Sequence, residues 1–343
     1  MKKLAAVGVV LALIAGAAFY LINRRVTAPY RGYSTPEQII EIPSGIGPNE
    51  IGRRLVTAGV IRDQATFRLA LSMSRSARHL QAGDYRFDRP MSAVEVIGKI
   101  ARGEVDLVSI TFPEGLTIAE MSKIFEASGL GSASAFAEAA RNVALIRELD
   151  GVAADLEGYL FPDTYAVPHR ADASVVVGLM IDRFRRVLTP ELRAAAEARS
   201  ITVRQLVTLA SIVEKETARP DERARVAAVY ANRLRIGMAL QCDPTVIYAL
   251  QKTGTYNGNL RRDDLLFDSP YNTYRYPGLP PGPIAAPGKG SIEAAAQPAA
   301  TGDLYFVSRN DGSHEFARTL DEHNQNVRKY QIQYFRERRL SRP

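Results

Sequence analysis

An apolar run near the N-terminus constrains this chain most strongly. Residues 4–22 (LAAVGVVLALIAGAAFYLI) carry no charge; two lysines precede them, and Arg24 and Arg25 follow. A helix of this length spans about 28 Å, close to the hydrocarbon thickness of a bilayer. Buried helices of soluble proteins are rarely so free of polar groups over such a length. We therefore predict a membrane anchor over residues 1–25.

The fate and the orientation of this segment stay open. Residues 15–17 (AGA) are small, as in a signal-peptide cleavage site, so removal of the segment is the alternative to its retention. The two arginines directly after the run favour retention. Basic residues flank both sides, and a long following domain counts little in the positive-inside rule, so the flanking charges do not determine the orientation.

The distribution of charge removes one class of partner. The formal charge is +7, of which residues 1–25 contribute +4 and residues 328–343 contribute +5, so residues 26–327 carry −2. A slightly acidic body argues against nucleic acid as a partner. The basic tail at 331–343 suits anionic lipid or wall polymer, with a solvated end as the plainer explanation.

The rare residue types exclude several kinds of site. A single cysteine, Cys242, excludes an internal disulfide and any multi-cysteine zinc or iron–sulfur site. Four histidines are present, and the spacing of His314 and His323 matches no metal-binding pattern. These two are expected to be structural or to contact substrate. The sequence predicts no metal and no cofactor.

A repeat follows a predicted linker at 26–38. Residues 42–46 (IPSGI) align with 112–116 (FPEGL) at an offset of 70, and Gly59 aligns with Gly129. Each copy predicts a strand, a Pro-x-Gly turn, a helix that ends at glycine, and a second helix. A duplicated binding module and the recurrence of a stable helical unit are both compatible with this pattern.

A helix that starts near residue 202 places one carboxylate unusually. Residues 202–205 (TVRQ) form a capping-box pattern. At about 100° per residue, the apolar side chains that follow occupy one arc of the helix surface, and Glu214 falls inside this arc. Lys215 and Glu216 fall outside it and are expected to face water. The helix therefore directs Glu214 along its own buried face.

A buried carboxyl group is a candidate general acid. Burial disfavours the charged form and raises the pKa of a carboxyl group, which is what proton donation near neutral pH requires. The alternative is that Glu214 forms an ion pair with Arg204, Arg223 or an arginine of another helix. An exposed Glu214, or one locked in a bidentate pair away from any groove, would be incompatible with the acid role.

Several motifs in a fixed order carry a resemblance. They are residues 156–165 (LEGYLFPDTY), 210–217 (ASIVEKET), 240–248 (LQCDPTVIY), 269–274 (SPYNTY) and 278–284 (GLPPGPI), followed by 303–307 (DLYFV), 314–316 (HEF), Thr319 and 322–324 (EHN). Together they closely resemble the endolytic murein transglycosylase family. The resemblance extends from the anchor to about Tyr330 and is weakest in the repeat region.

The resemblance implies a fold and a location. The fold class is α+β: an N-terminal transmembrane helix, a small LysM-like α/β module over residues 39–110, and a mixed α+β catalytic domain over 111–330, in which 111–150 is a candidate second repeat unit. It also implies a single-pass protein of the inner membrane with its catalytic domain on the periplasmic side. Implied partners are peptidoglycan glycan strands and the membrane, with penicillin-binding proteins of wall synthesis as further candidates.

The resemblance also implies a reaction. Glu214 protonates the glycosidic oxygen between N-acetylmuramic acid and N-acetylglucosamine, then helps the C6 hydroxyl of the same muramic acid attack its anomeric carbon. The product is a 1,6-anhydro end, which terminates elongation of the strand. Two alternatives stay open: a non-catalytic peptidoglycan-binding adaptor, and a hydrolytic muramidase.

Other motif residues are predicted to bind substrate, because rings and hydrogen-bonding side chains suit a sugar. They are Glu157, Gln241, Asp243, Thr245, Tyr271, Asn272, Thr273, Tyr274 and His314. The plainer alternatives are a turn with packed tyrosines at 271–274 and a helix capped by Asp243 before Pro244. Cys242 departs from the family, which usually has Ser or Thr there, so a hydroxyl contact at this position is in doubt.

Overall fold

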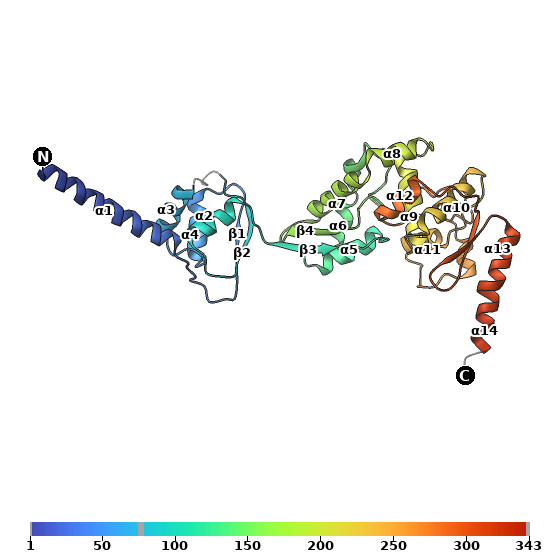
Figure 1. Ribbon diagram of the computed structural model, residues 1–343. Helices are drawn as coiled ribbons and strands as arrows, with labels where there is room; N and C mark the ends of the chain where they lie inside the picture. Colours follow the sequence, from blue (N-terminus) through green and yellow to red (C-terminus); the bar gives the residue numbers. More distant parts are fainter. Residues whose placement is uncertain (1, 75–78, 341–343) are drawn as a thin grey trace. The chain divides into compact units, whose positions relative to one another are not determined.

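The computed structural model describes residues 2–74 and 79–340 (Figure 1). The chain divides into two compact units, residues 1–109 with 166–170 and residues 110–165 with 171–343. Helices and short two-stranded sheets make up both units, as expected for a mixed α+β fold.

Helix α1 (Lys2–Thr27) contains the apolar run. Its segment Val7–Thr27 is long and apolar enough to cross a membrane, and the side chains along it are largely exposed. Its last turn differs, because Val26 is completely buried in the core of the first unit and Arg25 pairs with Asp63 at 2.7 Å. The helix therefore continues from the candidate anchor directly into a folded unit.

The first unit has a strand–helix–helix–strand order. Strand β1 (Gln38–Ile42) precedes α2 (Pro48–Thr57) and α3 (Gln64–Ser74), and β2 (Gly83–Phe87) returns to pair antiparallel with β1, followed by α4 (Ala93–Ala101). A reciprocal capping box between Ser92 and Glu95 starts α4. Its core contains Leu55, Phe67, Tyr85 and Ile97, which are all almost completely buried.

The segment 26–38, expected to be a linker, makes specific contacts with this unit. Tyr30 forms a backbone bridge with Met91. The Gly32 N–H donates to the Gly59 carbonyl at 2.8 Å, and the Tyr33 hydroxyl donates to the Phe87 carbonyl at 2.9 Å. These isolated contacts form no regular element, which explains why the segment shows no periodicity in sequence.

The repeat is visible in the structure. Helix α2 begins at Pro48 and α5 (Ile118–Ala127) begins 70 residues later, and α6 (Ala133–Ala139) follows α5 as α3 follows α2. The paired turn glycines adopt the same left-handed backbone, with φ of 82° at Gly45 and 76° at Gly115. Strand β3 (Leu107–Thr111) precedes α5 and pairs with β4 (Thr164–Pro168). Both copies therefore share a strand, a glycine turn and two helices.

The second unit is mainly helical. Its further elements are η1 (Val143–Ile146), α7 (Ala173–Val187), α8 (Pro190–Glu197), α9 (Val203–Glu216), α10 (Arg223–Arg235), α11 (Asp243–Lys252), η2 (Arg262–Leu266), α12 (Lys289–Ala296), β5 (Tyr305–Ser308), β6 (His314–Ala317), α13 (Leu320–Val327), the π-helical segment η3 (Arg328–Gln333) and α14 (Tyr334–Leu340). Helix α9 lies at its centre, because every residue from Leu206 to Val213 is buried and α8, α10, α11 and α12 all pack against it.

The C-terminal part begins with a β-hairpin. Strands β5 and β6 pair antiparallel, with Tyr305 opposite Ala317 and Ser308 opposite His314. Asn310 has φ of 64° in the connecting turn, a conformation that asparagine tolerates better than most residues. The predicted basic tail at 331–343 lies in η3 and α14 as far as Leu340, and its last three residues lie outside the described part of the chain.

Candidate active site at the end of helix α9

Helix α9 fixes the position of Glu214. Thr202 and Gln205 form the predicted capping box, which sets where the helix begins. Glu214 lies in the last turn, before the chain becomes extended at Thr217. Its side chain is only 7% exposed, as its place in the apolar arc predicts. The carboxylate is therefore held at the end of a rigid and almost completely buried helix.

One oxygen of Glu214 is bound by helix α12. The Gly288 N–H donates to Oε2 at 3.0 Å, and the Ser291 hydroxyl donates to the same atom at 2.7 Å. Gly288 is the N-cap residue of α12, so its N–H lies at the positive end of that helix. These contacts fix the orientation of the Glu214 carboxylate. Its other oxygen, Oε1, takes part in neither of these two hydrogen bonds.

Arg223 lies between two carboxylates. Its Nη2 atom is 3.5 Å from Oε1 of Glu214 and 3.4 Å from Oε2 of Glu114. The ion pair that was the alternative to the acid role is therefore present, but through one nitrogen shared with a second acid. Arg204 takes no part in it, because it pairs with Asp150 at 2.9 Å.

A second carboxylate, that of Glu114, interacts electrostatically with both Glu214 and Arg223. Partial burial raises the pKa of Glu114, and the negative charge of Glu214 raises it further, while Arg223 acts in the opposite direction. A side chain on Gly288 would occupy the space of the Glu114 carboxylate, which would have to move away from this position. The site thus brings together two acids and one arginine.

The turn of the second repeat copy completes the surroundings of Glu214. The backbone of Gly115 lies against the Glu214 side chain, and the Lys215 ammonium donates to the Gly115 carbonyl at 3.1 Å. Two backbone hydrogen bonds with Ala286, at the N–H of Gly115 and the carbonyl of Leu116, hold this turn at 2.8 Å each. The repeat therefore supplies one wall of the site.

The prediction that Glu216 faces water is wrong. The Tyr230 hydroxyl donates to its Oε1 at 2.7 Å, and the thiol of Cys242 donates to the same atom at 3.0 Å. Burial raises the pKa of Glu216. The physical reason is tertiary: α10 and α11 cover the face of α9 that the helical pattern assigned to solvent.

The motif residues at 241–245 and 271–274 come together beside Cys242. The Cys242 N–H donates to the Thr273 hydroxyl oxygen at 3.0 Å, and the hydroxyls of Thr245 and Thr273 are 2.9 Å apart. The Tyr274 hydroxyl donates to Asp243 at 2.6 Å. These contacts link the two motifs with α9 through the bond between Cys242 and Glu216.

The exposure of these residues divides them into two groups. Thr245, Asn272 and Thr273 are buried, and the Asn272 amide donates to the carbonyls of Leu265 and Phe267, so their polar groups brace the loop. Gln241 and Asp243 are exposed, with φ of 51° at Gln241. The alternative that Asp243 caps a helix is wrong, because Cys242 is the N-cap residue and Asp243 is already helical.

Glu157 contacts helices α5 and α11 of the second unit. It accepts hydrogen bonds from the Ile118 N–H at 3.1 Å and the Tyr248 hydroxyl at 3.3 Å, and the Tyr248 ring lies 4.9 Å from that of Tyr271. Burial is the main cause that raises the pKa of Glu157 to about 8, and the charge of Asp155 adds to it. At neutral pH this carboxyl group therefore holds its proton.

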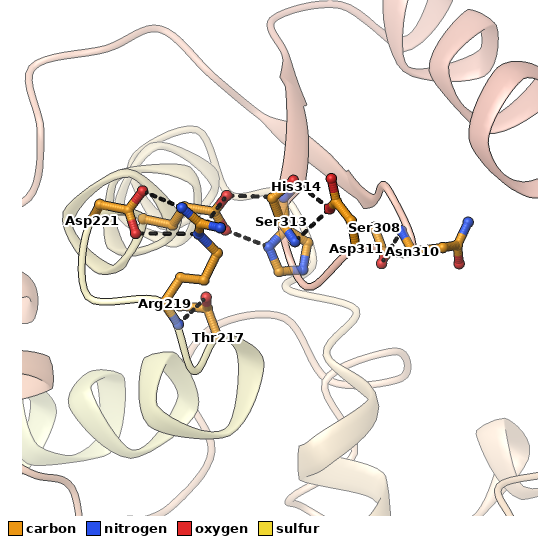
Figure 2. Close-up of polar contacts among 9 residues, drawn as sticks. Thr217, Arg219, Asp221, Ser308, Asn310, Asp311, Ser313 and His314 are labelled. Atoms are coloured by element: carbon orange, nitrogen blue, oxygen red, sulfur yellow. Dashed lines mark hydrogen bonds and ion pairs between the residues drawn. The ribbon is translucent and has the colours of Figure 1, made fainter.

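Hydrogen bonds to Glu222, the residue before Arg223, hold His314 in place. The Nδ1 atom of the His314 ring (Figure 2) lies 2.7 Å from one oxygen of the Glu222 carboxylate, and the His314 N–H donates to the other oxygen at 3.0 Å. Arg219 pairs nearby with both oxygens of Asp221. His323 instead stacks on Tyr305, with ring centroids 5.1 Å apart. Within residues 2–74 and 79–340, no cluster of three or more His, Cys, Asp or Glu side chains suits a metal ion.

Sequence reasoning missed three contributors to the site. Ser291 and Gly288 lie more than 70 residues after Glu214, in a stretch without a recognisable motif. Glu114 lies in the repeat, whose pattern indicated a turn and gave no sign of an acidic role. The one signal in the sequence is that Glu114 directly precedes Gly115, the turn glycine that the structure places beside Glu214.

The fold and this site define an α+β protein with a buried glutamate held between helices α9 and α12, and comparison with known proteins supplies the family. The model of the YceG-like family matches residues 40–329, so the chain belongs to that family. It is 33% identical over 335 residues to the endolytic murein transglycosylase of Bacillus subtilis, with 93% of this chain and 91% of that protein covered.

Two further similarities extend this comparison. The chain is 30% identical over 318 residues to the endolytic murein transglycosylase of Streptococcus pneumoniae D39, and the match spans 57% of that longer protein. A crystal structure of a yceG-like protein from Listeria monocytogenes aligns with a TM-score of 0.58 at 29% identity, covering 85% of this chain and all of that one.

Proposed function

We propose that this protein is an endolytic lytic transglycosylase that cleaves peptidoglycan glycan strands without water, with Glu214 as its only acid–base residue. The names of its relatives support the activity. The observation that carries the assignment to Glu214 is the fixation of its Oε2 by Gly288 and Ser291, while among the described residues Oε1 contacts only Arg223, which is shared with Glu114. Such a carboxyl group is oriented in advance and has one oxygen left for substrate.

The proposed reaction has two proton transfers. Glu214 first donates its proton to the glycosidic oxygen as the bond from the anomeric carbon of muramic acid breaks. The resulting carboxylate then accepts the proton of the C6 hydroxyl of the same sugar while that oxygen attacks the anomeric carbon. The proton returns to Glu214, and no water enters the products.

Ser291, Gly288 and Arg223 have supporting roles in this proposal. The first two keep the carboxyl group in one orientation during both transfers, since both donate to the oxygen that does not face Arg223. Arg223 compensates negative charge when Glu214 is ionised between the two steps, because its guanidinium is 3.5 Å away.

A hydrolytic muramidase is the second candidate, and Glu114 favours it. Most glycosidases use two carboxyl groups, one as acid and the other as nucleophile or base for water. Glu114 shares Arg223 with Glu214, so a second acid is present at the site. The resemblance to transglycosylases favours the first candidate, and the chemical nature of the new strand ends distinguishes the two.

The first unit is proposed to bind glycan as a LysM-like module. Support comes from its strand–helix–helix–strand order with two antiparallel strands, β1 and β2. A protein that only binds strands through this unit would be the adaptor considered above. Retention of α1 as a single-pass anchor in the inner membrane, a periplasmic catalytic domain and contact with penicillin-binding proteins are likewise proposals, supported by the apolar segment Val7–Thr27 and the wall-directed names of the relatives.

The products test this proposal. The full chain in detergent micelles, Glu214→Gln, and the exposed control Glu197→Gln are each incubated with glycan strands, and the new ends are weighed. We expect ends one water lighter than reducing ends from the wild type and the control, and none from Glu214→Gln. Reducing ends would indicate the muramidase, cleavage by Glu214→Gln would remove that residue from the chemistry, and binding without any cleavage would indicate the adaptor.

A further inference from the structure

A cavity of about 500 Å³ lies between helices α5, α6 and α11 of the second unit. We call it the α5–α11 pocket; its lining includes Ile118, Lys123, Ala137, Glu157, Tyr248 and Lys252. Its volume is within the range of small-ligand sites. The reaction proposed above uses none of these residues for proton transfer, so the pocket has no role in that chemistry.

The rim of the α5–α11 pocket presents positive charge. Lys123 and Lys252 line it and are exposed, whereas Arg141, which also lines it, pairs with Glu138 at 3.0 Å. Two of its acids are engaged within the protein: Glu120 accepts from the Thr117 N–H at 2.8 Å in the cap of α5, and the buried Glu157 accepts from the Ile118 N–H. Cations at the rim therefore outnumber the carboxylates available to a ligand.

The remaining lining is small and apolar. Ala137 of α6, Ala140 directly after this helix and Ile118 of α5 are the apolar residues, and the Tyr248 ring forms a flat side, with the Lys252 ammonium 5.5 Å from its centroid. Asp155 offers a carboxylate to a peptide N–H or an ammonium group. An uncharged sugar would gain little from the two lysines, whereas a short anionic peptide with small side chains matches this combination.

The pocket is within reach of the proposed active site. Gly115 lies against Glu214, and the pocket begins at Thr117, two residues further along the chain. Two residues extend over at most about 7 Å, and an extended tetrapeptide spans about 14 Å. A peptide attached to a sugar at Glu214 is therefore long enough to enter the pocket.

We propose that the α5–α11 pocket binds the peptide stem that muramic acid carries in nascent peptidoglycan, with Lys123 and Lys252 contacting stem carboxylates. This inference rests on the proposed function, because it names a further part of the same substrate. It makes the pocket a specificity site, which selects strands that still carry stems.

Paired substrates test the inference. Intact strands and strands stripped of their stems by an amidase are given to the full chain in detergent micelles, to Lys123→Ala/Lys252→Ala, and to the control Arg186→Ala, an exposed cation on α7. We expect the wild type and the control to have higher kcat/KM on intact strands. In the double variant the ratio of intact to stripped should fall about tenfold. A wild-type ratio near one, or an unchanged ratio in the double variant, would overturn the inference.

A binding measurement separates this inference from the proposed function. A fluorescent synthetic tetrapeptide stem is titrated into the same three proteins. Binding that weakens about tenfold in the double variant alone supports the pocket even if no strand is cleaved, in which case only the proposed function fails. Equal binding by all three proteins, or none by the wild type, would refute the pocket even if Glu214 cleaves strands as proposed.

Discussion

The Ser291 hydroxyl, on helix α12, donates to Oε2 of Glu214, on helix α9, at 2.7 Å. Both side chains are almost completely buried, and the two residues are far apart in sequence. The bond therefore depends on the packing of α12 against α9, one of the most extensive contacts between elements in the unit. This packing holds the carboxyl group of Glu214 in one orientation.

Replacement of Ser291 tests that role. Ser291→Ala removes one hydrogen bond to Glu214, and bonds to charged groups contribute about 1.5–3 kcal/mol, so we expect kcat to fall about 10- to 100-fold with little change in KM. Ser122→Ala is the matched control, because Ser122 is a buried serine whose hydroxyl donates only to the Ile118 carbonyl of its own helix. Equal kinetics for the two variants would contradict the positioning role.

Glu114 separates the one-acid from the two-acid mechanism. If Glu214 acts alone, Glu114→Gln should reduce kcat/KM less than about tenfold, since it removes only a charge shared through Arg223, and anhydro ends should persist. The measurement is the rate and the end chemistry of strand cleavage beside Glu214→Gln. Losses of the same size in both variants, together with reducing ends from the wild type, would instead assign Glu114 a direct role.

The buried Glu157 predicts a particular dependence of stability on pH. Its pKa is about 8 in the folded protein and near 4.5 when unfolded. Between these values the folded state holds a proton that the unfolded state has released, so the free energy of unfolding decreases as pH rises, by up to about 1.4 kcal/mol per pH unit. The contribution of Glu157 to the free energy of unfolding is fully present below its unfolded pKa of 4.5, and it is lost once the pH exceeds its folded pKa of about 8.

Glu157→Gln should flatten this dependence. Urea unfolding of wild type and variant at several pH values between about 5 and 8 gives the two slopes. Glu216, whose pKa is also raised by burial, contributes in the same direction in both proteins, so the difference between slopes isolates Glu157. The exposed Glu197→Gln should keep the wild-type slope. Parallel curves for wild type and Glu157→Gln would show that Glu157 is ionised in the folded state.

Cys242 provides a simple probe of the region beside the site. It is the only cysteine in the chain, it is buried, and burial raises its pKa well above the usual range. We expect an aromatic disulfide reagent to modify the native protein at least about 100-fold more slowly than the protein in denaturant. Rapid stoichiometric modification of the native protein would contradict the buried bond from Cys242 to Glu216.

Local chemistry predicted much of this structure. The capping box at Thr202 and the paired glycine turns of the repeat depend on residues that are close in sequence, and both are present. The burial of Glu214 followed from helical periodicity alone, because one face of α9 is continuously apolar.

Contacts between distant segments could not be predicted in the same way. Ser291 and Glu114 reach Glu214 only because α12 and the Gly115 turn pack at the end of α9. The sequence pattern predicts that Glu216 faces solvent, since the periodicity of one helix does not reveal that α10 and α11 cover it. The contacts of segment 26–38 are isolated bonds to the first unit, which leave no periodic signal.

The most direct test of the central claim uses water enriched in heavy oxygen. The full chain in detergent micelles cleaves glycan strands in this water, and mass spectrometry of the new muramic acid ends follows. If Glu214 directs the C6 hydroxyl of the same sugar to its anomeric carbon, the ends are anhydro sugars without the heavy isotope. Reducing ends that carry the heavy isotope would show that water attacks instead, and would contradict the account.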